Sequence, residues 1–512
     1  MPERIATWRR PRSRPPALPV RSGADAATLL RKFPPDGRGR LYEQLARVLR
    51  RAIVEGHFQV GERLPSTRAL AESLGLSRNT VTTAYEILGA GQLTISRERC
   101  GTRVADIPLP PRSSPASRVV EPQSRYAARV RKLRLSAPGR QRESLRYDLR
   151  CDPPFGPELI PLWRRKLAAA ARLAGPRYPD SQGFRPLRAA ISDYLARRRG
   201  VVCAESDILI VSGAQQAITV AIRTVLDEGD TVAIEDPHAP QLLQALSAHG
   251  VSVAGVRTDE HGMVTDDLAR HNARLICVSP SESFPAGAVM SLQRRAALLD
   301  IASRQDSWIL EANYNGEFHY RDQPIAALRS LDLSGRVIYM GTFSKTLFPA
   351  MRLGYVVCPA GLRDDLCAIK RLDDLGSPLA EQAALAAFMR TRQFESYLRR
   401  TVAELERRRT VFVNSLRRHG GERLAVQETH AGTHVVVWLR QLTYPQITRL
   451  VELAAERGLG LYPMHPYYLN PPERPGLLLG YAGLSADALE RAGELLGECL
   501  DELEEQGERR HF

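Results

Sequence analysis

Beyond about residue 147, short apolar runs alternate with helical segments, and this alternation constrains the fold more than any other feature of the chain. Five strand-sized runs read DILIVSG, TVAIED, RLICVSP, SWILEANY and RVIYMGTFSK. Strands that alternate with helices form a mostly parallel sheet with helices on both faces. From about residue 395 the pattern becomes helical and then mixed. We therefore predict an α/β domain over 147–512 that ends in a smaller α+β lobe at about 395–512.

Two stretches without periodicity precede this domain. Residues 1–38 are rich in proline and arginine, which predicts a disordered basic arm. Residues 106–146 combine prolines with arginine and serine, a composition typical of a linker. Between them, apolar residues recur at helical spacing over 41–53, and two short helices and a hairpin are predicted to follow. The segment 39–105 is thus predicted as a separate, mostly helical domain.

The segment RLPSTRALAESLGLSRNTVTTAYEILGAGQL predicts a helix–turn–helix. Ser66 and Ser77 are each placed to cap a helix, and Gly75 supplies the turn between them. The second helix carries an apolar stripe at i, i+3, i+4 and i+7, namely Val81, Ala84, Tyr85 and Leu88. Its polar edge suits the major groove, where Arg binds guanine, Asn binds adenine and Ser or Thr binds phosphate. Two short helices around a glycine turn also occur without any role in DNA binding.

Composition narrows the setting. The formal net charge is +15, which favours a polyanionic partner, although an arginine-rich composition alone produces the same excess. The seven cysteines are scattered without a C-x-x-C pair, which indicates reduced thiols and argues against a zinc site. We find neither an apolar run long enough to span a membrane nor a signal peptide. A cytoplasmic protein is therefore expected, with no membrane association and no metal.

The stretch LYEQLARVLRRAIVEGHFQVGERLPSTRALAESLGLSRNTVTTAYEIL resembles the winged-helix domain of the GntR regulators over nearly its whole length. The resemblance implies double-stranded DNA as a partner. Together with the exposed edge of the second helix it gives the expected DNA-binding residues, which are Arg68, Ser77, Arg78, Asn79, Thr80, Thr82 and Gly101. Thr82 stands where many relatives have arginine, so no base preference is transferred there. The hairpin arginines Arg97, Arg99 and Arg103 are either contacts to phosphate or the minor groove, or parts of a solvated turn.

A second set of residues indicates pyridoxal-phosphate chemistry. In GTFSKTLFPAMRLGY, Lys345 follows a strand, with Thr342 three residues before it and Arg352 seven after. A lysine amine forms the Schiff base, while a hydroxyl and an arginine hold the phosphate. In SGAQQA, a helix opens after a strand, so the backbone N–H groups of Ala214 and Gln215 would bind the same phosphate.

These signals together resemble the MocR/GabR subfamily, in which a GntR winged helix is fused to a class I aminotransferase domain of fold-type I. The resemblance runs from about Leu41 to the C-terminus and includes YPDSQGFRPLRAAISDYLARRRGV and IYMGTFSKTLFPAMRLGY. It implies pyridoxal 5'-phosphate as the cofactor and a head-to-tail, domain-swapped homodimer. Tyr314, which follows the strand in SWILEANY, is expected to hydrogen-bond the phenolic oxygen of the cofactor.

The chain departs from this pattern around the cofactor. EANYNGEF stands where relatives have EDDYDSEF, so the aspartate that pairs with the ring nitrogen falls on Ala312. EDPHAP stands where relatives have EDPGYPG, so the stacking aromatic falls on Ala239. The adjacent His238 either stacks in its place or is a surface-loop residue, and we favour the second interpretation. SPSES replaces TPSHQ, and near PGLLLGYA no arginine is placed for a substrate carboxylate, Arg474 being only nearby. Without the carboxylate the ring is a poor electron sink, so we expect impaired transamination and assign no catalytic residue.

Three hypotheses follow. The leading one is a transcription regulator whose aminotransferase-like domain senses a small molecule, an amino acid or an amine, with pyridoxal phosphate on Lys345 as a sensor element. The second is an active aminotransferase with an accessory DNA-binding domain. The third is a pyridoxal-free sensor on the same scaffold, in which Lys345 is a relic. The first and third explain the altered cofactor residues equally well.

Overall fold

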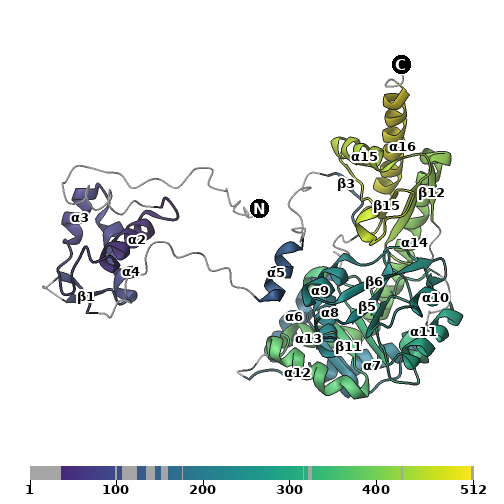
Figure 1. Ribbon diagram of the computed structural model, residues 1–512, viewed down its shortest axis with the longest axis horizontal. Coiled ribbons are helices and arrows are strands. Elements are labelled where there is room, and N and C mark those ends of the chain that lie inside the picture. Colours follow the sequence, from purple (N-terminus) through teal and green to yellow (C-terminus); the bar gives the residue numbers. More distant parts are fainter. Residues whose placement is uncertain are drawn as a thin grey trace. The chain divides into compact units, whose positions relative to one another are not determined.

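The computed structural model describes residues 36–97, 101–106, 124–133, 145–151, 159–173, 175, 177–314, 316–320, 326–427 and 431–508. The chain forms two compact units, Met1–Pro122 and Gln123–Phe512, which are described separately (Figure 1). Almost all of the predicted basic arm, 1–38, lies outside the described residues.

The first unit is a three-helix domain with a two-stranded hairpin. Its elements are α2 (Leu41–Val54), α3 (Thr67–Leu74), α4 (Arg78–Ala90), β1 (Thr94–Arg97) and β2 (Gly101–Val104). The side chains of Ser66 and Ser77 accept hydrogen bonds from the third residue after each, and Gly75 ends α3 with φ 65°, as predicted. The predicted apolar stripe of α4 is buried. The hydroxyl of Tyr85 donates to the carbonyl oxygen of Pro65 at 2.7 Å, which fixes α4 to the turn before α3.

The second unit contains an eight-stranded sheet, in the order β4-β11-β10-β9-β8-β5-β6-β7. Its strands are β4 (Ile208–Val211), β5 (Thr231–Asp236), β6 (Ser252–Asp259), β7 (Gly262–Met263), β8 (Leu275–Val278), β9 (Trp308–Asn313), β10 (Val337–Thr342) and β11 (Gly354–Val357). The central pairs from β10 to β6 are parallel, whereas β11, β4 and β7 pair antiparallel. All five apolar runs form strands of this sheet, which confirms the predicted α/β class.

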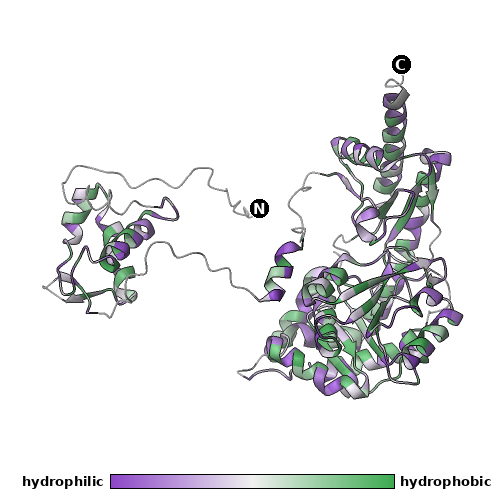
Figure 2. Cartoon of the chain, in the orientation of Figure 1, coloured by the Kyte–Doolittle hydropathy of each residue, from purple (hydrophilic) through white to green (hydrophobic). Residues whose placement is uncertain are grey.

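Helices cover both faces of the sheet, as Figure 1 shows. One face packs against α8 (Ala214–Val225), α9 (Pro240–His249) and α12 (Arg363–Asp374). The other packs against α7 (Arg185–Arg199), α10 (Thr265–Leu268), α11 (Leu292–Arg304) and α13 (Leu379–Met389), and α6 (Ile160–Ala170) lies on α13. Hydrophobic residues concentrate on the strands, while the covering helices are hydrophilic on their outer sides (Figure 2). The sheet is therefore a buried layer between two helical layers.

The smaller lobe is a mixed α+β structure, as predicted. It contains α14 (Arg392–Gly420), α15 (Tyr444–Glu456) and α16 (Ala486–Glu508) around an antiparallel sheet of β12 (Leu424–Val426), β13 (His434–Leu439) and β15 (Gly476–Gly480). A short parallel pair joins β14 (Leu459–Gly460) to β3 (Tyr147–Asp148), so the first strand of the second unit belongs to this lobe.

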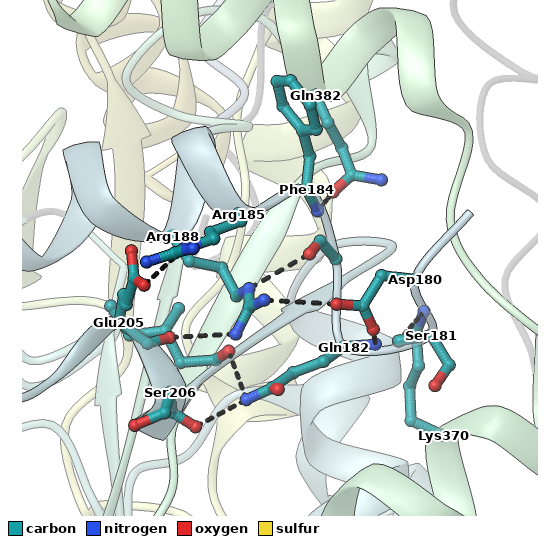
Figure 3. A network of polar contacts seen from close by, with 12 residues as sticks. Asp180, Ser181, Gln182, Phe184, Arg185, Arg188, Glu205, Ser206, Lys370 and Gln382 are labelled. Atoms are coloured by element: carbon teal, nitrogen blue, oxygen red, sulfur yellow. Dashed lines mark hydrogen bonds and ion pairs between the residues drawn. The ribbon is translucent and has the colours of Figure 1, made fainter.

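Polar contacts fix the segment before α7, part of the stretch that carries the family resemblance (Figure 3). The buried guanidinium of Arg188 contacts the carboxylate of Asp180 and the carbonyl oxygens of Gly183 and Glu205, at 3.2, 3.0 and 3.2 Å. The carbonyl oxygen of Gln182 accepts the N–H of Ile210 at 2.9 Å. The segment thereby covers the free edge of β4, the strand that leads into the α8 turn.

The stretch predicted as a linker, 106–146, contains a helix that the sequence did not predict. Helix α5 (Arg125–Lys132) lies against α9 in the second unit. None of its residues is fully buried, and only Ala127, Val130 and Leu133 form a short, partly buried apolar edge. Charged side chains hold it instead: Arg129 Nε and Nη2 donate to the carbonyl oxygens of Ala248 and His249, at 2.9 and 3.0 Å.

Candidate functional site

A cavity of about 460 Å³ in the second unit brings together all six residues that the sequence suggested for a cofactor. They are Ala214, Gln215, Tyr314, Thr342, Lys345 and Arg352. Each follows the carboxyl end of a sheet strand or lies in the segment after it, the position where α/β sheets bind ligands. The structure thus assembles the predicted set at one place, although its role with a cofactor stays a prediction.

One end of the cavity is built for an anion. Gly213, with φ 85°, precedes α8, and the first two residues of that helix, Ala214 and Gln215, line the cavity. The first N–H groups of a helix have no partner within it and are suited to bind an anion. Arg352 Nη2 donates to the carbonyl oxygen of Ser212 at 2.8 Å, which places the guanidinium beside the helix N-terminus. The hydroxyl of Thr342 accepts the N–H of Ser344 at 3.2 Å and also lines this cavity. A guanidinium, a hydroxyl and a helix N-terminus together form a cradle suited to phosphate.

Lys345 lines the same cavity. Its Nζ donates to the carbonyl oxygen of Cys151 at 3.2 Å. Burial lowers the pKa of Lys345 to about 8, against an opposing effect of Cys151. A much larger fraction of this lysine is therefore neutral near pH 7 than of an ordinary lysine, and only the neutral amine attacks an aldehyde.

Sequence reasoning missed the residues that reach this cavity from the smaller lobe and from the segment after β3. They are Arg150, Cys151, Tyr462 and Tyr467. The carboxylate of Asp148 accepts hydrogen bonds from Arg150 and, at 2.6 Å, from the hydroxyl of Tyr462. Arg150 therefore brings a cation to the cavity wall. The sequence had offered no arginine near PGLLLGYA for a substrate carboxylate. Tyr462 lies more than three hundred positions from Asp148, so no local signal could have paired them.

A narrower cavity of about 20 Å³ adjoins the first and shares Tyr314 and Ala239 with it. Ala312 lines this narrower cavity, so β9 contributes a methyl group where the family pattern has a carboxylate. Glu235 and His238 also line it. Burial raises the pKa of Tyr314, which keeps its phenol protonated and able to donate.

The interpretation of His238 as a surface-loop residue is wrong. The residue is 3% exposed, and its N–H donates to the carbonyl oxygen of Tyr467 at 2.8 Å. The carboxylate of Asp236 accepts the N–H groups of Leu469 and Asn470 at 2.9 and 3.2 Å. The smaller lobe therefore covers the end of β5, and the loop that follows the strand is buried. Burial also lowers the pKa of His238, which favours a neutral imidazole.

These residues fit pyridoxal phosphate at its phosphate and aldehyde ends. The cradle at Gly213 leaves little room for a side chain, because a Cβ there would lie 3.1 Å from the guanidinium of Arg352. Ala312 and Ala239 leave the ring-nitrogen and stacking positions without the residues that the family pattern has there. The cavity wall nevertheless contains two buried polar atoms that have no hydrogen-bond partner among the described residues, the ring nitrogens of His238.

The residues expected to contact DNA lie on three elements: Arg68 on α3, Gly101 on β2, and the others at the N-terminus and on the exposed edge of α4. Arg68, Arg78 and Asn79 are exposed. The hydroxyls of two others are engaged within the helix: Thr80 Oγ1 lies 2.9 Å from Ser77 Oγ, and Thr82 Oγ1 donates to the carbonyl oxygen of Arg78 at 3.0 Å. Arg78 and Asn79 therefore carry the strongest base-reading potential on this helix.

The wing offers fewer arginines to DNA than its sequence suggests. Arg103 Nη1 donates to the carbonyl oxygen of Gly61 at 2.8 Å, so this side chain fastens the hairpin to the turn before α3. Arg99 and the side chain of Arg97 lie outside the described residues. Gly101 has φ 75°, and a Cβ there would lie 2.7 Å from Nε of Arg63. Arg63 is thus an exposed wing-side cation that sequence reasoning missed.

Over the described ranges, no helix is both long and apolar enough to cross a membrane. Within the same ranges, no three side chains of His, Cys, Asp or Glu gather as a metal ion would need.

Comparisons with known proteins match both units. Residues 156–494 match the family Aminotransferase class I and II, and residues 41–104 match the bacterial regulatory proteins of the gntR family. The chain is 34% identical over 477 residues to the probable rhizopine catabolism regulatory protein MocR of Rhizobium meliloti, covering 91% of this chain and 95% of that protein. It is 28% identical to the pyridoxine biosynthesis transcriptional regulator PdxR of Corynebacterium glutamicum, covering 87% and 93%.

Among solved structures, the multiple substrate aminotransferase of Thermococcus profundus superposes with a TM-score of 0.65 at 22% identity. The match covers 72% of this chain and 93% of that one. At this identity the likeness shows the fold alone.

Proposed function

Because the chain belongs to the MocR/GabR subfamily of GntR transcription regulators, we propose that it binds pyridoxal phosphate on Lys345 and that a small amine or amino acid in the same cavity changes its binding to DNA. It is a helix–turn–helix regulator with an aminotransferase-like domain. The predicted domain-swapped homodimer, the cytoplasmic location and a very low transaminase activity belong to the same proposal.

The observation that carries the cofactor proposal is the single cavity in which Lys345 lies beside the cradle of Arg352, Thr342 and the α8 N-terminus. Bound there, pyridoxal phosphate supplies an aldehyde that condenses with amines. Arg352 and the helix N-terminus bind the phosphate group, and the phenol of Tyr314 orients the ring by donating to its oxygen. The neutral amine of Lys345 is the attachment point.

Low catalysis follows from what the same cavity lacks. Ala312 carries no charge to stabilise a protonated ring nitrogen, and Ala239 has no ring to stack on the cofactor. Binding through the phosphate and the amine needs neither residue, because Arg352, Thr342 and Lys345 supply those contacts. These residues therefore support a sensor more than an efficient transaminase.

Helix α9 offers a route from the cavity to the linker. Its first residues, Pro240 and Gln241, line the cavity, while its last carbonyl groups hold α5 through Arg129. Helix α5 belongs to the segment that leads from the winged-helix domain. A ligand that shifts α9 would change how firmly α5 is docked, provided that it binds the two arrangements with unequal affinity.

A pyridoxal-free sensor is the second candidate. It is favoured by Ala312 and Ala239 and by the cation of Arg150 in the cavity wall, which would suit an acidic metabolite. The hypothesis of an active aminotransferase explains neither Ala312 nor Ala239.

Purified protein mixed with pyridoxal phosphate tests the proposal directly. We expect a visible absorption band that borohydride bleaches, with the cofactor mass then fixed on the Lys345 peptide and absent from Lys345→Ala. A colourless, unlabelled protein that still responds to a metabolite would favour the second candidate.

DNA binding is tested by gel shift with the chain's own upstream region, at several salt concentrations. Arg78→Ala should weaken the specific complex about tenfold to a hundredfold, the usual cost of one base contact. Arg407→Ala removes an equal charge from an exposed site on α14 and serves as the control. Equal losses in both variants would mean that α4 does not read the operator.

A further inference from the structure

The narrow cavity beside Ala312 is an extension of the larger one. At about 20 Å³ it has room for no more than a water molecule, so it is not a separate ligand site. It adjoins the larger cavity along Ala239 and Tyr314. Because the family pattern has the partner of the ring nitrogen at position 312, this is where the ring nitrogen of a bound cofactor is expected.

The imidazole of His238 belongs to the wall of this narrow cavity. The residue is 3% exposed, and both of its ring nitrogens are buried without a hydrogen-bond partner among the described residues. A neutral imidazole has one donor and one acceptor nitrogen, and leaving both unsatisfied in a buried position costs free energy. Folded proteins rarely retain such groups without a use, so this ring is expected to have a partner in the working state.

The narrow cavity lies on the face of the sheet that carries the cofactor residues. Most of its apolar lining, including Leu310 and Met340, belongs to the same core cluster under α8 as Ala312 and Tyr314. His238 lies between β5 and α9, and α9 packs on this same face. It therefore contributes to the cavity wall from the cofactor side of the sheet.

The backbone of His238 is held in place, whereas its ring is held by packing alone. The N–H of His238 donates to the carbonyl oxygen of Tyr467 at 2.8 Å. Two residues earlier, the carboxylate of Asp236 accepts the N–H groups of Leu469 and Asn470. Because no hydrogen bond to a described residue fixes the imidazole, it can turn about its Cβ–Cγ bond without losing one. A ligand atom that reaches the narrow cavity would meet an available donor.

We propose that His238 donates a hydrogen bond from its imidazole to the ring nitrogen of pyridoxal phosphate. The inference rests on the proposed function, since it needs the cofactor in the larger cavity. At this position β9 offers only the methyl group of Ala312, so the imidazole supplies the polar contact that the strand lacks. The family pattern EDPGYPG has a glycine where this chain has His238, so the pattern itself offers no side chain for this contact.

A hydrogen bond accounts for the observations better than stacking of the imidazole on the cofactor ring. Stacking in place of the aromatic missing at Ala239 would use the face of the imidazole and leave both nitrogens unsatisfied. Burial lowers the pKa of His238, against an opposing effect of the Asp236 carboxylate, and so favours the neutral imidazole. A neutral donor pairs with an unprotonated ring nitrogen, and an unprotonated ring is a weak electron sink. The contact thus holds the cofactor without supporting transamination.

The test compares four full-length proteins: wild type, His238→Phe, His238→Gln and His465→Phe. Phenylalanine keeps a flat ring but has no N–H, whereas glutamine keeps an N–H donor without the ring. His465 is an exposed histidine of the smaller lobe, and its variant serves as the control. Equilibrium dialysis measures the affinity for pyridoxal phosphate. Nitrogen NMR of cofactor labelled at its ring nitrogen distinguishes a free, a hydrogen-bonded and a protonated nitrogen.

His238→Phe should bind pyridoxal phosphate about fivefold to a hundredfold more weakly, because the buried ring nitrogen loses its donor. Its nitrogen resonance should move to that of a free pyridine nitrogen. His238→Gln should keep the resonance of a hydrogen-bonded nitrogen, and His465→Phe should match wild type in both measurements.

Wild-type affinity and an unchanged resonance in His238→Phe would overturn the inference and favour stacking. A protonated ring nitrogen in wild type at neutral pH would also overturn it, and that measurement does not depend on the folding of any variant. The unfolding temperatures of the cofactor-free proteins show whether a variant has lost its fold or only the contact. Failure of wild type to be labelled on Lys345 with borohydride would instead refute the cofactor proposal itself, before His238 is tested.

Discussion

Substitution of Arg129 by alanine should uncouple the linker helix from the aminotransferase-like domain. Its guanidinium donates to the carbonyl oxygens of Ala248 and His249 at the C-terminal end of α9, and it contacts Glu228 at 3.0 Å. The helix end is electronegative, so both hydrogen bonds are strengthened by charge. The backbone is shaped for this contact, because Gly250 has φ 91° and a Cβ there would lie 2.5 Å from Cζ of Arg129.

The magnitude follows from these contacts and from their exposure. The side chain of Arg129 is 24% exposed and that of Glu228 is 48% exposed, so solvent screens the ion pair and most of the effect comes from the two hydrogen bonds. Together they should stabilise the docked state by about 1–3 kcal/mol. Their loss would change the ratio of docked to undocked α5 by a factor of roughly 5 to 150.

Hydrogen exchange of the α5 amides measures the docking, and gel shift with and without ligand measures the coupling. Arg129→Ala should speed exchange in α5, keep operator binding and reduce the response of that binding to pyridoxal phosphate or an amino acid. Arg125→Ala is the matched control, because that side chain is 86% exposed and lies 3.6 Å from Glu228. A full ligand response in an Arg129→Ala protein with rapid α5 exchange would refute the α9–α5 route.

Two further predictions concern the cavity. Burial lowers the pKa of Lys345 to about 8. The rate at which the cofactor-free protein incorporates pyridoxal phosphate should therefore rise with pH through about 8 and then level off. A rate that keeps rising toward the ordinary lysine pKa of 10.5 would contradict this prediction. Gly213→Ala should displace Arg352 and weaken the binding of pyridoxal phosphate about tenfold or more, while the binding of pyridoxal stays unchanged. Gly229→Ala controls for backbone strain, because Gly229 also has a positive φ but a Cβ there would meet no atom within 4 Å. If Gly213→Ala weakened the binding of both ligands equally, the cradle would not be a phosphate-binding site.

Periodicity made the framework of this molecule predictable. The five apolar runs became strands and the stripe of α4 became buried because both depend on residues within a few positions of each other. The cofactor set was equally accessible, since Thr342, Lys345 and Arg352 lie on one short segment. Their meeting with Ala214 and Tyr314 follows from the rule that parallel strands end at the same edge of the sheet.

What the sequence did not reveal depends on contacts between distant segments. The burial of His238 requires the smaller lobe to close over β5, and the orientation of Arg150 requires Asp148 and Tyr462. For Arg103 the sequence left open a DNA contact or a solvated turn, whereas in the structure it donates to the carbonyl oxygen of Gly61, forty-two positions away. The residues next to an arginine in the sequence do not indicate which distant group its guanidinium will contact. Single arginines are therefore the least predictable members of a site.

The pattern of retained and lost residues argues for selection on binding rather than on turnover. Phosphate and amine contacts supply affinity, whereas a permanently charged ring-nitrogen partner matters most when charge develops during reaction. A sensor needs the first and gains nothing from the second, because it reports through the unequal affinity of a ligand for two arrangements of the protein.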